Sequence, residues 1–189
     1  MFEELLDRLR DVRETPLSAV SMGKLVGAMI AVGLLFTLEL TSQDGWVPIL
    51  DSLNLVFHES GHPLFSIFGE TIGFMGGTLM QLIVPLLVLS SCWYKRQAVA
   101  IGLAGLWFFE NFLNIARYMA DARTQELPLV GGGEHDWTTL FGQWGLLAQD
   151  TAIAGVVKTL GWTGMCCCLG WIAWRWFRDR GLASRPGLG

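Results

Sequence analysis

The sequence predicts an all-α, polytopic helical membrane protein with four to five transmembrane helices and one further membrane-inserted helix that carries a polar motif. Of its 189 residues, 52% are hydrophobic and only 16% are charged, a balance more apolar than that of an ordinary soluble domain. Nine tryptophans and eleven phenylalanines fit a lipid-facing surface with aromatic anchors at its edges. The formal net charge of −4 argues against a nucleic-acid partner.

Three segments follow from the distribution of charge. Residues 1–16 mix acidic and basic residues with apolar ones at helical spacing, which predicts an amphipathic surface segment that ends at Pro16. Residues 17–178 form a single transmembrane helical domain. Residues 179–189 are expected to be a disordered tail.

Four apolar runs are the candidate membrane spans: 25–38, 72–93, 98–119 and 152–174. A fifth run, 47–68, is interrupted by polar residues. It is either a full span, which gives five spans, or a helix that enters the membrane without crossing it, which gives four.

The basic residues decide between these two counts. They cluster at residues 8–24, at Lys95-Arg96 and at 175–180, and such clusters favour the cytoplasmic side. All three lie on one side only if 47–68 does not cross, so we favour four spans. Both termini are then cytoplasmic, and the loop at 120–150 lies with the 47–68 motif on the non-cytoplasmic side.

The motif is His58-Glu59-Ser60-Gly61-His62, which has the pattern H-E-x-x-H. On a helix, residues four apart lie on one face, so both imidazoles can bind one metal ion. Glu59 projects to the side and can reach a metal-bound water instead of the metal. This pattern predicts a Zn²⁺ site in which Glu59 is the catalytic base.

Two polar residues upstream share the face of the histidines. Asp51 and Asn54 are therefore candidates to hydrogen-bond the imidazoles and fix their orientation. Pro63 directly follows the motif and removes a helical hydrogen bond, so the helix is expected to end or kink there.

Two histidines leave a catalytic zinc ion without its usual third protein ligand. The segment LVGGGEHDW at 129–137 contains the one remaining imidazole, His135, between Glu134 and Asp136. Imidazole suits zinc, so we favour His135. Asp136 is the alternative, either as a direct ligand or as the carboxylate that orients a ligand histidine, and Glu134 is a further candidate for the substrate or ligand shell.

The run at 98–119 carries a polar stripe that includes Asn111 and Asn114. Their amides can hold a substrate backbone or a developing oxyanion. Alternatively, they form hydrogen bonds between helices, which is common in membranes.

These features together resemble the site-2-protease, or M50-type, intramembrane zinc metallopeptidases. The resemblance lies in HESGH within an apolar segment, in the glycine-bearing turn GETIGFMGG at 69–77 and in the span that begins GTLMQLIVP. The resemblance is in particular to a group of small bacterial M50-like membrane proteins that carry GGGEHDW. It implies a bacterial inner-membrane zinc peptidase with His58 and His62 as ligands, Glu59 as base and a peptide or membrane protein as substrate. The family's N-P-D-G segment, which supplies an aspartate ligand, is absent from this sequence.

Two other functions fit the same residues. The first is a zinc-dependent hydrolase of lipid amides or esters, since the same activated water attacks either carbonyl. The second is a non-catalytic metal-binding subunit of an oligomer or larger membrane complex.

Overall fold

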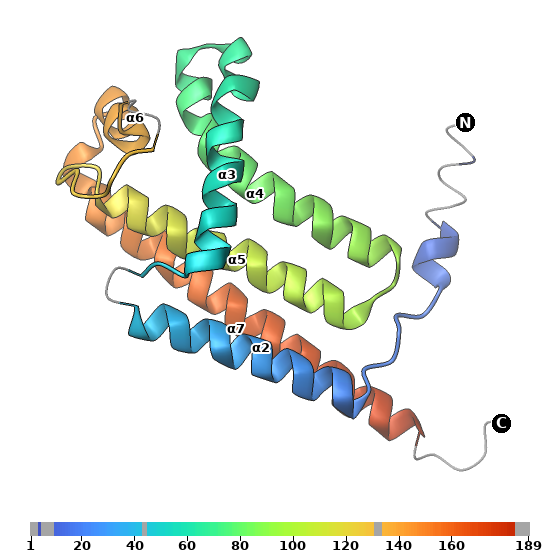
Figure 1. The fold of residues 1–189 in the computed structure, drawn as a ribbon. Helices are drawn as coiled ribbons and strands as arrows, with labels where there is room; N and C mark the ends of the chain where they lie inside the picture. Colours follow the sequence, from blue (N-terminus) through green and yellow to red (C-terminus); the bar gives the residue numbers. More distant parts are fainter. Residues whose placement is uncertain (1–3, 5–9, 43–44, 131–133, 184–189) are drawn as a thin grey trace.

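The computed structural model describes residues 4, 10–42, 45–130 and 134–183, and all of its regular structure is helical (Figure 1). The predicted all-α class is confirmed. The elements are α2 (Met22–Thr41), α3 (Pro48–Phe65), η1 (Ser66–Phe68), α4 (Glu70–Tyr94), α5 (Ala98–Ala120), α6 (Asp136–Trp144), η2 (Leu147–Gln149) and α7 (Asp150–Ala183).

Within the described residues, four helices are long and apolar enough to cross a membrane: Met22–Thr41, Glu70–Tyr94, Ala98–Ala120 and Leu147–Gly181. They match the four predicted runs, and they support an integral membrane protein. α3, which carries HESGH, is not among them.

One predicted segment end differs from the structure. α7 remains helical to Ala183, past residue 178, where the tail was expected to begin; residues 184–189 lie outside the described part. Near the other end, residues 10–14 are helical, while most of the apolar positions of the 1–16 segment lie outside the described residues.

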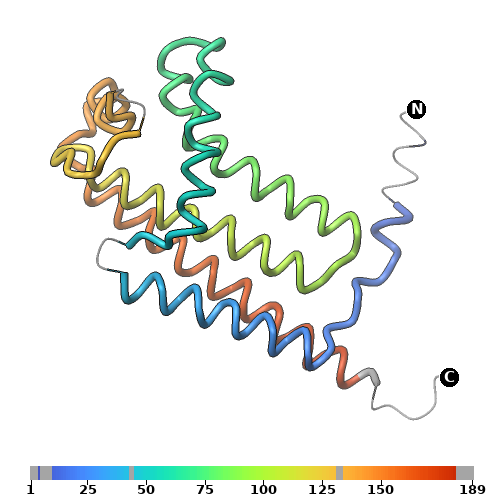
Figure 2. Tube along the Cα trace, viewed as in Figure 1, coloured from blue at the N-terminus to red at the C-terminus, as the bar shows by residue number. Residues whose placement is uncertain are grey.

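Helix α5 lies at the centre of the bundle, with α7 along one side and α4 along another (Figures 1 and 2). Glycines allow α5 and α7 to approach closely. A Cβ on Gly164 would overlap the ring of Phe109, and one on Gly102 would overlap Ile172. α2 packs on α7 through a buried cluster that includes Ala28 and Val32. Close contact through small residues is the usual basis of helix association in membranes, where no hydrophobic force drives it.

The three basic clusters meet at one end of this bundle. The chain before α2 hydrogen-bonds to both of the others: Ser18 N donates to the Arg96 carbonyl (2.7 Å) and Val20 N donates to Asp179 Oδ2 (3.0 Å). This is the arrangement that the four-span interpretation requires.

Helix α3 runs steeply across the direction of the bundle, and the first turns of α4 pack against it (Figures 1 and 2). The helix continues through Pro63 to Phe65 instead of ending at His62. The contact with α4 is made through glycines, because a Cβ on Gly61 would overlap the carbonyl oxygen of Gly76. The two backbones are therefore in direct contact here, with no room for a side chain between them.

Gly61→Ala should destabilise the protein by about 1–3 kcal/mol, since an added methyl group must push α3 away from α4. Thermal unfolding in detergent measures this. The matched control is Gly33→Ala, where an added Cβ meets nothing within 4 Å. Equal stability of the two variants would contradict the close α3–α4 contact.

Candidate metal centre

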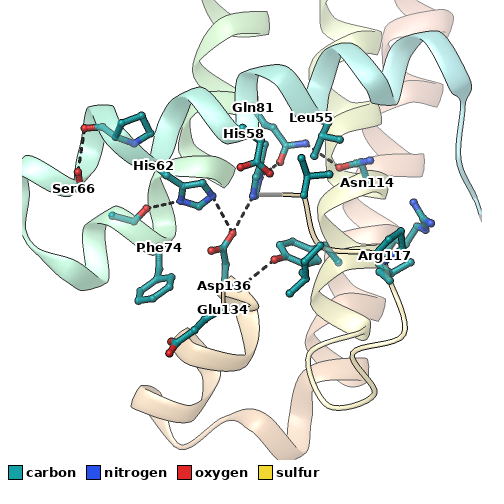
Figure 3. A pocket seen from close by; sticks show the side chains of 18 of the residues that line it. Leu55, His58, His62, Ser66, Phe74, Gln81, Asn114, Arg117, Glu134 and Asp136 are labelled. Atoms are coloured by element: carbon teal, nitrogen blue, oxygen red, sulfur yellow. Dashed lines mark hydrogen bonds and ion pairs between the residues drawn. The ribbon is translucent and has the colours of Figure 1, made fainter. Parts of the chain in front are cut away.

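Two histidines of α3 and one aspartate of α6 converge on a single point (Figure 3). Asp136 Oδ2 lies 2.9 Å from His58 Nε2 and 3.3 Å from His62 Nε2. The candidate ligand atoms of the three residues lie within 4.8 Å of one another. His58 and Asp136 are buried, and His62 is partly exposed. Among the described residues, this group can hold a metal ion.

The far side of each imidazole is also hydrogen-bonded. His62 Nδ1 lies 2.9 Å from the Gly73 carbonyl oxygen, and His58 Nδ1 lies 2.9 Å from Gln81 Oε1. A carbonyl only accepts, so His62 Nδ1 carries a proton. The hydrogen bond to Asp136 raises the pKa of His62 to about 9, although burial lowers it. The protonated ring thus donates to Asp136 through Nε2, at a position where a metal ion could replace the proton.

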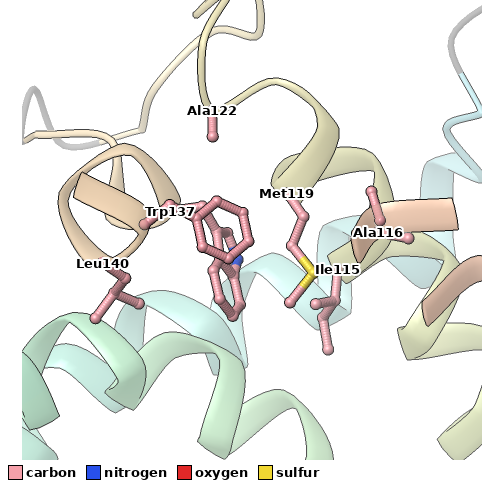
Figure 4. Packing of buried hydrophobic residues seen from close by; sticks show 8 residues of the cluster. Ile115, Ala116, Met119, Ala122, Trp137 and Leu140 are labelled. Carbon is pink, nitrogen blue, oxygen red and sulfur yellow. The ribbon is translucent and has the colours of Figure 1, made fainter. Parts of the chain in front are cut away.

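Asp136 is held in place by the packing of α6. Helix α6 buries Trp137, Leu140 and Phe141 in a cluster with Ile115 and Met119 of α5 (Figure 4). The backbone N–H of Asp136 donates to the hydroxyl of Tyr118 (3.2 Å). Burial raises the pKa of the Asp136 carboxyl, but hydrogen bonds from His58 and His62 lower it by more, so the pKa lies below its ordinary value.

His135, which the sequence analysis favoured as the third ligand, faces away from the two histidines of α3. Its Nδ1 accepts a hydrogen bond from Thr138 N (3.3 Å) and so caps α6, while its Nε2 lies 3.4 Å from Asp121 Oδ2. Burial lowers the pKa of His135, which favours the neutral ring that this cap needs. Neighbouring residues at a helix start point in different directions, and here the aspartate points at the histidines.

The loop between α5 and α6 is organised by Asp121. Its carboxylate accepts hydrogen bonds from the Thr124 hydroxyl (2.7 Å) and from the backbone N–H groups of Glu126 (2.8 Å) and Leu127 (3.1 Å). Burial raises the pKa of Asp121, but these hydrogen bonds lower it to below its ordinary value. The same carboxylate faces His135, so loop and helix cap are held together.

The three residues open onto a groove of about 1140 Å³. Glu59 lines it beside the two histidines, and Glu134 lines it from the loop side. Its walls combine charged residues with apolar ones, among them Arg117 and Leu129. Arg117 also lies over the ring of Trp46, 5.5 Å from its centroid.

The three candidate asparagines are engaged within the protein. Asn54 donates to Glu110 Oε2 (2.9 Å) and accepts from Trp107 Nε1 (2.9 Å), so both of these bonds lead to α5 and not to an imidazole. Asn111 donates to the Trp107 carbonyl (3.0 Å), and Asn114 accepts from Gln81 Nε2 (2.9 Å). Two roles were considered for the polar residues of α5, substrate binding and hydrogen bonding between helices. The observed contacts fit the second role, although Asn114 also lines the groove.

Sequence reasoning missed two residues of the site. Gln81 of α4 bonds to His58, and the ring of Tyr118 lies edge-on to His58 with centroids 5.6 Å apart. Gln81 carried a usable signal, because a polar side chain within an apolar span is costly unless it has a buried partner. The packing position of Tyr118 has no such signal.

Comparison with protein-family models, curated protein sequences and solved structures gave no match for this chain. The case for a function therefore rests on the geometry of the site and on the motif.

If the three residues hold a metal ion, Asp136→Ala should weaken its binding as severely as His62→Ala, because both remove an atom that faces the common point. His135→Ala removes only the cap of α6 and should weaken metal binding less. Metal analysis of the purified variants, with zinc competition against a chelator, ranks the three. A greater loss in His135→Ala than in Asp136→Ala would return the third position to the histidine.

Proposed function

We propose that this protein is a membrane-embedded zinc metallopeptidase that hydrolyses peptide bonds within or near the membrane. The observation that carries the proposal is the convergence of His58 Nε2, His62 Nε2 and Asp136 Oδ2 at the wall of a groove, with Glu59 beside them. The resemblance of HESGH and its flanking segments to the M50-type peptidases agrees with it.

The donor set suits zinc. Two imidazole nitrogens and one carboxylate oxygen are common zinc ligands, and at zinc–ligand distances of about 2.0–2.2 Å the ligand atoms of a tetrahedral site stand roughly 3.4 Å apart. The Asp136 Oδ2 to Nε2 separations of 2.9 and 3.3 Å need little adjustment. Three protein ligands leave a fourth position open, as in catalytic sites and unlike closed structural ones.

Bound zinc would supply a water of lowered pKa and would polarise the substrate carbonyl. His58, His62 and Asp136 would hold the ion. Glu59, which follows His58 on α3 and faces the groove, would accept the proton of the attacking water and deliver it to the leaving amine. Because Glu59 is partly exposed, it can exchange protons with the groove.

The groove favours a peptide over the two alternatives. Charged and polar side chains line it near the motif, including Glu70, Arg117 and Glu126, and these suit a polar backbone better than acyl chains. The open fourth position weighs against a purely structural metal site.

The orientation follows from the basic end of the bundle. Lys95, Arg96 and Arg175 mark that end, and the metal centre lies toward the other one (Figure 1). Under the positive-inside rule the centre faces the non-cytoplasmic side, and both termini are cytoplasmic.

Glu59→Gln should keep full zinc binding and lose hydrolysis by about 10²–10⁴-fold, the usual contribution of a positioned base. The assay is mass-spectrometric detection of cleavage in a mixture of single-span peptides reconstituted with the zinc-loaded protein. The control is Glu134→Gln, which changes a groove carboxylate that is not assigned to the water. Cleavage by Glu59→Gln at the wild-type rate would contradict the role of Glu59, and no cleavage by zinc-loaded wild type would contradict the peptidase.

A cysteine placed at Glu134 should react with a membrane-impermeant maleimide from the non-cytoplasmic side, because the loop shares the side of the metal centre. Cys92, Cys166, Cys167 and Cys168 are first replaced by serine. A cysteine at Ser18, in the basic end, is the opposite control. Labelling of the Glu134 position only from the cytoplasm would refute the orientation.

A further inference from the structure

The two asparagines considered as donors to a developing oxyanion are directed at partners within the protein. In peptide hydrolysis the oxygen of the attacked carbonyl gains negative charge, and a preformed hydrogen-bond donor stabilises that charge. Asn111 Nδ2 donates to the Trp107 carbonyl (3.0 Å). Asn114 Nδ2 donates to Asp51 Oδ1 (3.1 Å). A donor to the carbonyl oxygen of a bound peptide is therefore to be sought elsewhere on the wall of the groove.

Tyr118 of α5 has its hydroxyl group beside the residue of α6 that completes the metal centre. The hydroxyl accepts a hydrogen bond from the backbone N–H of Asp136 (3.2 Å). The carboxylate of Asp136 is directed at His58 and His62 (Figure 3). Tyr118 lines the same groove as these three residues. The hydroxyl is thus separated from the common point by no more than the length of one aspartate.

The proton of this hydroxyl has no acceptor among the described residues. A phenol both accepts and donates hydrogen bonds. Within the described part of the chain, the bond that it accepts from the Asp136 N–H is its only hydrogen bond. The O–H group is therefore free to donate to a molecule in the groove, and the carbonyl oxygen of a bound peptide is such an acceptor.

The ring of Tyr118 is held by two histidines. It lies edge-on to His58, with ring centroids 5.6 Å apart. It also lies against His135, with centroids 4.2 Å apart and an angle of 34° between the ring planes. His135 is itself fixed, because its Nδ1 caps α6. A donor that is already in position needs no reorganisation when charge develops on its acceptor.

We infer that Tyr118 is a catalytic residue that donates a hydrogen bond to the oxygen of the attacked peptide carbonyl; this inference rests on the proposed zinc peptidase function. As the water oxygen bonds to the carbonyl carbon, the electron pair of the C=O π bond moves to the carbonyl oxygen, and Tyr118 stabilises its negative charge. The double bond re-forms as the C–N bond breaks, and the amine nitrogen takes the proton that Glu59 received from the water. Tyr118 keeps its own proton throughout.

Tyr118→Phe removes the hydroxyl and keeps the ring. We expect kcat to fall about 10²–10³-fold, the usual loss for one donor to an oxyanion. KM should stay within about threefold, because the hydrogen bond gains its strength only in the transition state. Zinc affinity should also stay within about threefold, because Asp136 is the first residue of α6 and an N–H group at a helix start can bond to water instead.

The chain offers a matched control in Tyr94→Phe. Tyr94 is the second of only two tyrosines, and it ends α4 beside the basic residues at the other end of the bundle. Its loss of a hydroxyl group should leave both kcat and zinc affinity unchanged.

Direct binding separates this role from a structural one. A phosphinic peptide with the sequence of a cleaved substrate places a charged oxygen where the carbonyl oxygen gains charge. Its affinity, measured by titration calorimetry, should fall by about 10-fold or more in Tyr118→Phe. The uncleaved peptide, titrated into Glu59→Gln and Glu59→Gln/Tyr118→Phe, should bind equally well to both. A hydroxyl that only supports Asp136 would weaken the binding of both ligands or of zinc.

All measurements use the purified, zinc-loaded full chain in detergent, with thermal unfolding as a check on folding. The expected result is a loss of kcat and of phosphinic-peptide affinity, with zinc and substrate binding kept. Wild-type kcat in Tyr118→Phe, an equal loss in Tyr94→Phe, a loss of zinc affinity as large as that of kcat, or a Tyr118→Phe chain that no longer folds would each overturn the inference. No cleavage by the zinc-loaded wild type would instead refute the proposed function, and this inference with it.

Discussion

The metal centre depends on the close approach of α3 to α4. His58 lies against α4 where Gly77 has no side chain, and a Cβ there would stand 2.5–2.7 Å from three atoms of the imidazole. The same approach puts His62 beside the Gly73 carbonyl and His58 beside Gln81. A wider separation of the two helices would leave both Nδ1 atoms without their hydrogen-bond partners. Burying a polar group without such a partner costs free energy and therefore destabilises the fold.

The third residue reaches the site by a different route. Asp136 belongs to a short amphipathic helix whose position is set by apolar packing of Trp137, Leu140 and Phe141 on α5. The hydrogen bonds of Asp121 and His135 fix the approach of the chain to that helix. The site is therefore positioned by two independent features, the glycine contact between α3 and α4 and the capped, packed helix α6. Such support from both sides is expected for a site whose residues are held rigidly.

The sequence was informative where a local pattern determines the structure. Apolar length predicted the four candidate spans, and i, i+4 spacing predicted that His58 and His62 share a face. The sequence could not decide whether His135 or Asp136 faces the metal position. Adjacent side chains at a helix start point in different directions, and these directions can be assigned only when the first residue of the helix is known. The α3–α4 contact was equally hidden, since nothing local distinguishes a glycine that faces a backbone, such as Gly61, from one that faces open space, such as Gly33.

The partners of the two histidines differ in kind, and this affects how the site tolerates mutation. The Gly73 carbonyl is part of the backbone, so no side-chain replacement can take it from His62 while α4 keeps its path. The partner of His58 is a side chain, supported in turn by others. Substitution of a single side chain can therefore remove the hydrogen-bond partner of His58. The partner of His62 is lost only when a substitution changes the path of α4. In related chains, variation around this centre would be expected to concentrate on one half of it.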